Sequence, residues 1–334
     1  MIEGDSEGEH VKSFDHRHAR PPRESFVDPI YAVVKGGRGE LASVGFRIRE
    51  ARVILGWVAY RTSGGHVPMD FDAYERELWA GRAEAYGRGF ARMTAYTAPL
   101  LLDAVGARPG IDLLDVGTGP GVVAREAVAR GSRVRAVDAE PQMLELARRN
   151  VPGLDATRAI LPELPFPDGS FDAITGNYVI NHVGEPPAAL AELRRVLRPG
   201  GRIALTTWEF PGHRASAVYG DALEEAGVPW PEDVPISPFR AYGERDAFAG
   251  LLKDATFGEV RVERLDWTHT VDPEDWWAGP RDGVGSNGVV LSRLDAPTVA
   301  RVKAAYDHIV AAYATPDGLV ALPARALLAT AART

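Results

Sequence analysis

Three glycines in the stretch LLDVGTGPGVVA, residues 113–124, constrain the fold more than any other feature of this sequence. Gly117, Gly119 and Gly121 follow a short apolar run and are followed by small apolar residues with a helical pattern. Glycine lacks a Cβ, so the backbone can turn tightly and a ligand can approach it closely. The stretch therefore predicts a strand, a ligand-binding turn and a helix in succession.

Strands and helices are expected to alternate on both sides of this turn. Short apolar runs bounded by turn residues indicate strands, and longer segments with a period of about 3.6 residues indicate helices. This alternation predicts an α/β fold with a doubly wound, mainly parallel sheet that has helices on both faces. The strands are expected at 111–116, 133–138, 171–176 and 201–208, and the helices at 70–105, 121–131, 141–150 and 186–197.

Residues 1–68 differ from the rest of the chain. They mix turn-forming residues with short apolar runs and show little steady period, so we expect a poorly ordered leader. Helical periodicity begins directly after Met69, and we expect 69–334 to form the working domain. The leader histidines His10, His16 and His18 lack a scaffold that would fix ligand geometry, so no metal site is predicted.

Composition restricts the partners and the chemistry. The chain has 334 residues, 45% of them hydrophobic and 25% charged, as in ordinary globular proteins. No cysteine is present, which excludes disulfides, thiolate zinc sites and thiol nucleophiles. A net charge of -8 disfavours nucleic acid, and no apolar run is long enough for a membrane span. We expect a cytoplasmic monomer or homodimer that acts on a small molecule.

The residues around the glycine turn indicate a nucleotide-like ligand. Asp138 ends the next strand about 20 residues on, where a carboxylate can accept hydrogen bonds from ribose hydroxyls. The dinucleotide fingerprint would require glycine at position 122, which is Val122, and Asp115 would repel a pyrophosphate. The turn also lacks the Lys-Ser/Thr pair of a P-loop. A ligand with a cationic end is favoured over NAD and ATP.

Four motifs together resemble class I S-adenosylmethionine-dependent methyltransferases, most closely the ubiquinone/menaquinone-type branch. They are LLDVGTGPG, VRAVDAEPQMLELAR, LPFPDGSFDAI and ELRRVLRPGGRIALTTW, in the family's order and spacing over residues 111–208. The resemblance implies a seven-stranded sheet whose last strand is antiparallel, with ALPARALLATA, 321–331, as a candidate for it. It also implies a helical entry segment and a substrate cover over 209–243, inserted after the fifth strand.

The resemblance further implies a site for S-adenosylmethionine. Asp115 and the Gly117 backbone match the family's ammonium site, and Asp138 matches its ribose carboxylate. Where the family often has an adenine-binding aspartate this chain has Ile160, so the Leu161 backbone or Glu163 would take over that contact. The expected cofactor site comprises Tyr86, Asp115, Gly117, Thr118, Gly119, Gly121, Asp138, Ala139, Met143, Leu161, Asn177 and Tyr178.

His182 is the candidate catalytic residue, because it follows the strand expected at 171–176 and imidazole titrates near neutral pH. It would act as a general base or orient the acceptor; the alternatives are that it caps the next helix or packs beside the cofactor. The candidate acceptor pocket comprises Glu209, Tyr219, Trp230 and Phe239, with Trp276 and Trp277 further on. For the aromatic residues, ordinary core packing is the alternative.

The sequence thus predicts an enzyme that transfers a methyl group to an apolar or aromatic natural-product or quinone-like acceptor. An NAD(P)-dependent oxidoreductase shares the nucleotide fold but is disfavoured by Val122 and Asp115. A non-catalytic cofactor-binding module of the same fold stays open as a third alternative. Nothing in the sequence separates O-, N- and C-methylation.

Overall fold

The computed structural model describes residues 30–35, 41–46, 70–210, 212 and 214–334. The chain divides into two compact units, Met1–Val67 and Pro68–Thr334. In the first unit, β1 (Ile30–Lys35) pairs antiparallel with β2 (Leu41–Phe46), a hairpin that the sequence did not predict. The disorder expected elsewhere before residue 69 and the leader histidines lie outside the described residues.

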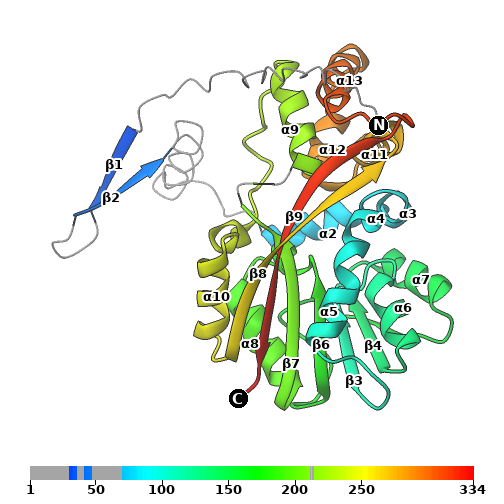
Figure 1. The fold of residues 1–334 in the computed structure, drawn as a ribbon, viewed down its shortest axis with the longest axis vertical. Coiled ribbons are helices and arrows are strands. Elements are labelled where there is room, and N and C mark those ends of the chain that lie inside the picture. The colour runs from blue at the N-terminus through cyan, green and yellow to red at the C-terminus, as the bar shows by residue number, and fades with distance from the viewer. Residues whose placement is uncertain (1–29, 36–40, 47–69, 211, 213) are drawn as a thin grey trace, which may run out of the picture. The chain divides into compact units, whose positions relative to one another are not determined.

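A seven-stranded sheet forms the centre of the second unit (Figure 1). Its order is β5-β4-β3-β6-β7-β9-β8, and β9 pairs antiparallel with both β7 and β8, whereas the other pairings are parallel. The predicted fold class, with an antiparallel last strand near the C-terminus, is confirmed. The strands are β3 (Asp112–Val116), β4 (Arg133–Asp138), β5 (Asp155–Arg158), β6 (Phe171–Asn177), β7 (Leu197–Trp208), β8 (Gly258–Val271) and β9 (Val320–Ala332).

Strand β3 shows why the central sheet forms. Residues Leu113, Leu114 and Val116 are buried, because a parallel strand covered by helices on both faces has no polar side. Strand β7 begins at Leu197, earlier than predicted, since Leu197 already pairs with Phe171 before the register shifts. Residues 198–200, which lie before the strand expected at 201–208, therefore belong to β7, and they lie where its pairing with β6 is irregular.

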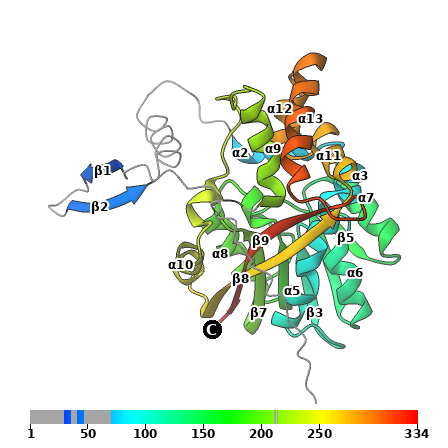
Figure 2. The same cartoon turned by 45° about the horizontal axis from the view of Figure 1, so that its top comes forward.

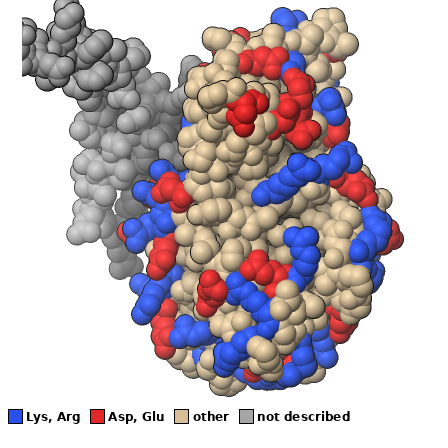
Figure 3. Space-filling model, turned by 45° about the vertical axis from the view of Figure 1, so that its right-hand side comes forward, with Lys and Arg blue, Asp and Glu red and all other residues tan. Residues whose placement is uncertain are grey.

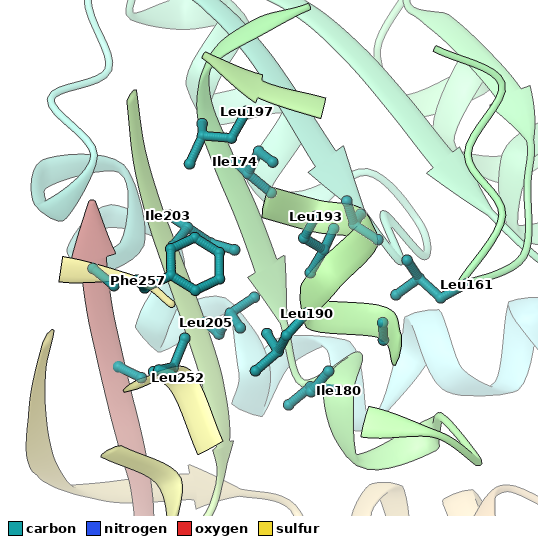
Figure 4. Packing of buried hydrophobic residues seen from close by; sticks show 14 of the residues in the cluster. Leu161, Ile174, Ile180, Leu190, Leu193, Leu197, Ile203, Leu205, Leu252 and Phe257 are labelled. Carbon is teal, nitrogen blue, oxygen red and sulfur yellow. The ribbon is translucent and has the colours of Figure 1, made fainter. Parts of the chain in front are cut away.

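Helices cover both faces of the sheet, and both cartoons show the same division (Figures 1 and 2). One face packs against α5, α6 and α7, and the other against α8 and α10. Figure 4 shows the core between α8 and the sheet, where Leu190 and Leu193 of α8 lie in one cluster with Ile174 of β6 and Ile203 of β7. The bounds are α5 (Ala98–Ala104), α6 (Val122–Ala129), α7 (Pro141–Asn150), α8 (Pro186–Val196) and α10 (Arg245–Asp254).

A second helical layer lies at the carboxyl ends of the parallel strands (Figure 1). Part of it comes from the entry segment and part from the predicted insertion, but α11, α12 and α13 lie between β8 and β9, where the sequence predicted no cover. We call this layer the helical cover. Its elements are α2 (Phe71–Trp79), α3 (Ala83–Arg88), α4 (Phe90–Thr94), η1 (Ala95–Thr97), α9 (Arg214–Glu225), α11 (Pro273–Arg281), α12 (Gly285–Ser292) and α13 (Ala296–Ala311). The short η3 (Pro238–Tyr242) of the insertion packs against α10 instead.

The surface carries charges of both signs. On the face drawn in Figure 3, basic and acidic side chains are interspersed among uncharged residues. Exposed ion pairs join them, for example Arg293 with Asp233 at 2.8 Å. Among the described helices, none combines the length and the apolar character that a bilayer span requires.

Candidate functional site

A cavity of about 720 Å³ lies where the parallel strands end beneath the helical cover. Its walls come from the glycine loop after β3, from the ends of β4 and β6, and from α2 and the start of α12. The carboxyl edge of such a sheet is the general ligand position of open α/β folds. Side chains from segments more than 150 residues apart thus share one space.

The glycine loop has the backbone geometry that the sequence predicted. Gly117, Gly119 and Gly121 have φ values of 64°, 52° and 84°, in the left-handed region that favours glycine. A Cβ on Gly117 would lie 2.4 Å from a methyl group of Val179, so side-chain-free backbone is required there. Gly117 and Gly119 line the cavity, whereas Gly121 faces Ala147 of α7. The structure gives Gly121 a role in helix packing instead of ligand contact.

Asp115 is buried beneath the loop and does not line the cavity. Its two carboxylate oxygens accept hydrogen bonds from the hydroxyls of Thr118, at 2.7 Å, and Thr175, at 2.9 Å. Burial raises the pKa of Asp115 to about 6, against the opposing effect of the two hydroxyls. Asp115 and Thr118 therefore stabilise the loop from below, and neither side chain is placed as a direct ligand contact.

Asp138 does line the cavity, at the end of β4. One carboxylate oxygen accepts the N–H of Gly119 at 2.8 Å, and the other accepts the N–H of Glu140 at 2.9 Å. Burial raises the pKa of this carboxyl, and the two backbone donors partly offset that effect. Each carboxylate oxygen can accept more than one hydrogen bond, so Asp138 retains acceptor capacity for two adjacent hydroxyls.

An apolar wall adjoins Asp138 on the side expected for adenine. Ala139, Met143 and Leu161 line the cavity there, and so does Ile160. Glu163 is exposed and does not line this cavity, because its N–H donates to the Ile160 carbonyl at 2.8 Å and the chain turns outward. The alternative in which Glu163 reaches the adenine is therefore not supported, and the Leu161 segment is left for this contact.

Asn177 and Tyr178 follow β6 into the cavity. The side-chain Oδ1 of Asn177 accepts hydrogen bonds from the hydroxyls of Thr97 and Thr206, both at 2.7 Å. These bonds link the entry helices to the sheet. Tyr178 has a φ of 57° and stacks on Trp208 with ring centroids 4.0 Å apart. Its hydroxyl is buried without a hydrogen-bond partner among the described residues, and burial raises its pKa. Asn177 is mainly a structural link, while Tyr178 presents an aromatic face.

His182 lines the cavity at the end of η2 (Ile180–His182). Its Nδ1 lies 2.8 Å from Oε2 of Glu75, a buried carboxylate on α2. The same Oε2 accepts the indole N–H of Trp79 at 3.0 Å, and the Trp79 ring meets His182 edge-on. Sequence reasoning did not find Glu75; its place on the apolar face of a short helix was a signal that the carboxylate would be buried with a partner.

The entry helices and the cover complete the walls. Tyr86 lines the cavity, and its hydroxyl lies 3.3 Å from Oγ1 of Thr94. Tyr219 also lines the cavity, with its hydroxyl donating to the Trp276 carbonyl at 2.7 Å. Several lining residues were not predicted, and all of them except Trp208, the last residue of a quoted motif, lie in segments that showed no motif. These residues are Asp72, Glu75, Arg76, Glu77, Trp79, Phe90, Trp208, Ser216, Pro280, Val284, Gly285, Ser286 and Asn287.

Four candidates for the acceptor pocket lie elsewhere. Trp230 is 44% exposed. Phe239 packs against Phe248 of α10, in the core between the sheet and the helices α8 and α10. Trp276 and Trp277 are buried in the core of the helical cover. Their apolar side chains fill the interior of these layers, so none of them lines the cavity.

Glu209 was a candidate for the acceptor pocket, and the structure pairs its carboxylate with arginines elsewhere. Glu209 is buried, and its Oε1 accepts two hydrogen bonds from Arg264, at 2.6 and 3.0 Å. Arg325 lies 3.4 Å from the other oxygen. The carboxylate thus joins β7 to β8 and β9, and it does not line the cavity.

Comparisons with known proteins identify sequence relatives of this chain. Residues 114–205 match the family model described as a methyltransferase domain. A demethylmenaquinone methyltransferase of Renibacterium salmoninarum is 39% identical over 177 residues, which cover 50% of this chain and 75% of that protein. An uncharacterised 37.1 kDa protein in transposon TN4556 of Streptomyces fradiae is 39% identical over 187 residues, 46% of this chain and 54% of that protein's length. The YcgJ protein of Bacillus subtilis superposes with a TM-score of 0.46 at 20% identity, over 71% of this chain and 98% of that structure.

The chain therefore belongs to the methyltransferase-domain family. Its cofactor is S-adenosylmethionine, and the oxidoreductase alternative receives no support. The cavity fits this cofactor, because five acidic and two basic side chains of the described residues line it and a sulfonium is cationic. Asp138 offers the ribose a carboxylate, and the apolar wall beside it suits a flat ring.

Proposed function

We propose that this protein transfers a methyl group from S-adenosylmethionine to a small apolar or aromatic acceptor held under the helical cover. The observation that carries the proposal is the shared cavity, because one space contains the glycine loop, Asp138 and the stacked rings of Tyr178 and Trp208. When bound, the cofactor supplies an electrophilic methyl group on a cationic sulfur. The chain itself has to bind, orient and shield the two reactants.

The cofactor would be held on the sheet side of the cavity. Asp138 would accept the ribose hydroxyls, and Gly117 and Gly119 would let the amino-acid part lie against the backbone. Ala139, Met143 and the Leu161 segment would enclose the adenine. Positioning of this kind can account for roughly 7–11 kcal/mol of the barrier of such a displacement.

The acceptor would lie on the cover side. Trp208 and Tyr178 supply a stacked aromatic face, and Tyr219 adds a buried ring to the same cavity. Such walls favour a flat apolar molecule, since aromatic rings stack in offset arrangements. The acidic lining disfavours an anionic acceptor. A quinone-like or natural-product acceptor fits these conditions, and His182 is the group placed to orient it.

Calorimetric titration of S-adenosylhomocysteine into the full chain tests the proposal, with NADH as the comparison ligand. We expect binding of S-adenosylhomocysteine and none of NADH, and a weakened interaction in Asp138→Asn. Asp155→Asn on the adjacent strand β5 is the matched control, because Asp155 is exposed and lies outside the cavity. Absence of S-adenosylhomocysteine binding by the full chain would contradict the proposed function.

The same titration tests the domain organisation. We propose that residues 69–334 form the methyltransferase domain, because the compact unit from Pro68 contains the whole sheet and the described cavity. A chain that begins at Met69 should bind S-adenosylhomocysteine as tightly as the full chain. Loss of folding or of binding in this shortened chain would show that the first unit is required.

A further inference from the structure

We propose that Glu75 is a positioning residue that holds His182 ready to take a proton from a hydroxyl group of the acceptor. This inference rests on the proposed function and makes it more specific, because it selects O-methylation and a phenol-like substrate. The two residues are 107 positions apart in sequence, and they come from α2 and η2, both of which contribute to the cavity wall.

The hydrogen bonds around Glu75 determine the tautomer of His182. The indole N–H of Trp79 can only donate, so Oε2 of Glu75 acts as an acceptor toward it. Because a carboxylate oxygen is an acceptor, we infer that Nδ1 of His182, 2.8 Å from the same oxygen, donates its proton to it. Nε2 then has the lone pair. Glu75 is buried, which makes its hydrogen bond costly to lose.

Nε2 of His182 is available to a ligand. His182 lines the cavity, and no described residue forms a hydrogen bond with its Nε2. The adjacent Asn181 also lines the cavity, and its Oδ1 is buried without a partner among the described residues. Two neighbouring acceptor atoms without protein donors favour a ligand that brings donors. A hydroxyl-bearing aromatic molecule meets this need and also suits the stacked face of Trp208 and Tyr178.

The proton and electron balance of the transfer is complete with these groups. The acceptor oxygen forms a bond to the methyl carbon, and the carbon–sulfur bond breaks with its electron pair left on sulfur. The hydroxyl proton moves to Nε2 of His182 and then to solvent. Throughout the transfer, Oε2 of Glu75 stays within hydrogen-bond distance of Nδ1 and holds the imidazole ring in place.

Nitrogen NMR of the full, ¹⁵N-labelled chain saturated with S-adenosylhomocysteine tests the tautomer directly. The His182 signals are identified by their loss in His182→Asn. We expect a protonated Nδ1 and an unprotonated Nε2 in the wild type, and a shift toward protonated Nε2 in Glu75→Leu. Glu145→Gln on α7 is the control, because Glu145 is exposed and does not line the cavity. Protonated Nε2 in the wild type would overturn the inference, even if Glu75→Leu fails to fold.

A matched pair of probes tests the acceptor class. 2-Naphthol carries a hydroxyl donor, and 2-methoxynaphthalene has the same rings without it. In the presence of S-adenosylhomocysteine we expect 2-naphthol to bind about tenfold more tightly, the effect of one hydrogen bond, and this preference to vanish in His182→Asn. Equal binding of both probes, or no binding of either, overturns the inference. S-Adenosylhomocysteine affinity in the same samples shows separately whether the proposed function survives.

Discussion

The carboxylate of Asp138 accepts the backbone N–H of Gly119 at 2.8 Å, which joins the end of β4 to the glycine loop. Replacing Asp138 by asparagine leaves only one acceptor oxygen and turns an amide N–H₂ toward a backbone donor. We expect the affinity for S-adenosylhomocysteine to fall about 10- to 100-fold, the effect of a hydrogen bond to a charged group. Calorimetry measures it, and Asp155→Asn should bind like the wild type.

Gly117→Ala should destabilise the protein for two separable reasons. The left-handed φ of 64° costs an alanine about 1–2 kcal/mol, and its Cβ would lie 2.4 Å from Val179. We expect a total loss of about 2–4 kcal/mol in the free energy of unfolding, measured by urea denaturation. Gly153 has a φ of 82° and open space around an added Cβ, so the Gly153→Ala variant measures the backbone cost alone. Adding Val179→Ala to Gly117→Ala should recover the steric part, and no recovery would contradict the clash.

Asp115 should make stability fall as pH rises. Its pKa is about 6 in the folded protein and 3.8 in its ordinary state, so the folded state binds more protons between these values. The contribution of Asp115 is therefore greatest below about pH 4 and is lost as pH rises through about 6. Relative to Asp115→Asn, the free energy of unfolding of the wild type should fall by on the order of 2–3 kcal/mol as pH rises across this range. Urea denaturation at a series of pH values measures the difference.

Asp112 on the same strand provides a control of opposite sign. Arg133 and Arg198 hold the pKa of this carboxyl below its ordinary value. Its stabilisation is therefore present above about pH 4 and is lost as pH falls through the lowered pKa. Relative to Asp112→Asn, the wild type should gain stability with rising pH. The same sign for both variants would contradict the assignment for Asp115.

Glu209→Gln should affect stability and leave cofactor binding unchanged. The buried carboxylate of Glu209 pairs with Arg264 and Arg325, so the substitution weakens charge-assisted hydrogen bonds that join three strands. We expect a loss of about 1–3 kcal/mol in the free energy of unfolding. Glu259→Gln, which breaks an exposed pair with Arg202, should cost less than about 1 kcal/mol. Weakened binding of S-adenosylhomocysteine in Glu209→Gln would place Glu209 in the site after all.

Predictions from the sequence were accurate where local patterns determine structure. The helix from Pro141 to Asn150 was predicted with both ends correct, because proline at the first turn and the apolar period are local signals. Strand β9 was also located, since its apolar run suits a strand buried in the sheet. The prediction of the acceptor-pocket residues was less accurate. The aromatic character of a residue indicates that its side chain will be buried, but it does not indicate in which layer. Phe239 and Trp276 are examples.

By itself, the sequence determined the sheet, the glycine loop and the place of Asp138, because short-range spacing and hydrophobic periodicity specify a strand, a turn and a helix in order. Only the tertiary structure decided that Glu75 meets His182 and that Glu209 meets Arg264. The physical reason is that a buried charged group must find a partner, but the identity of that partner depends on which distant elements the packing brings together.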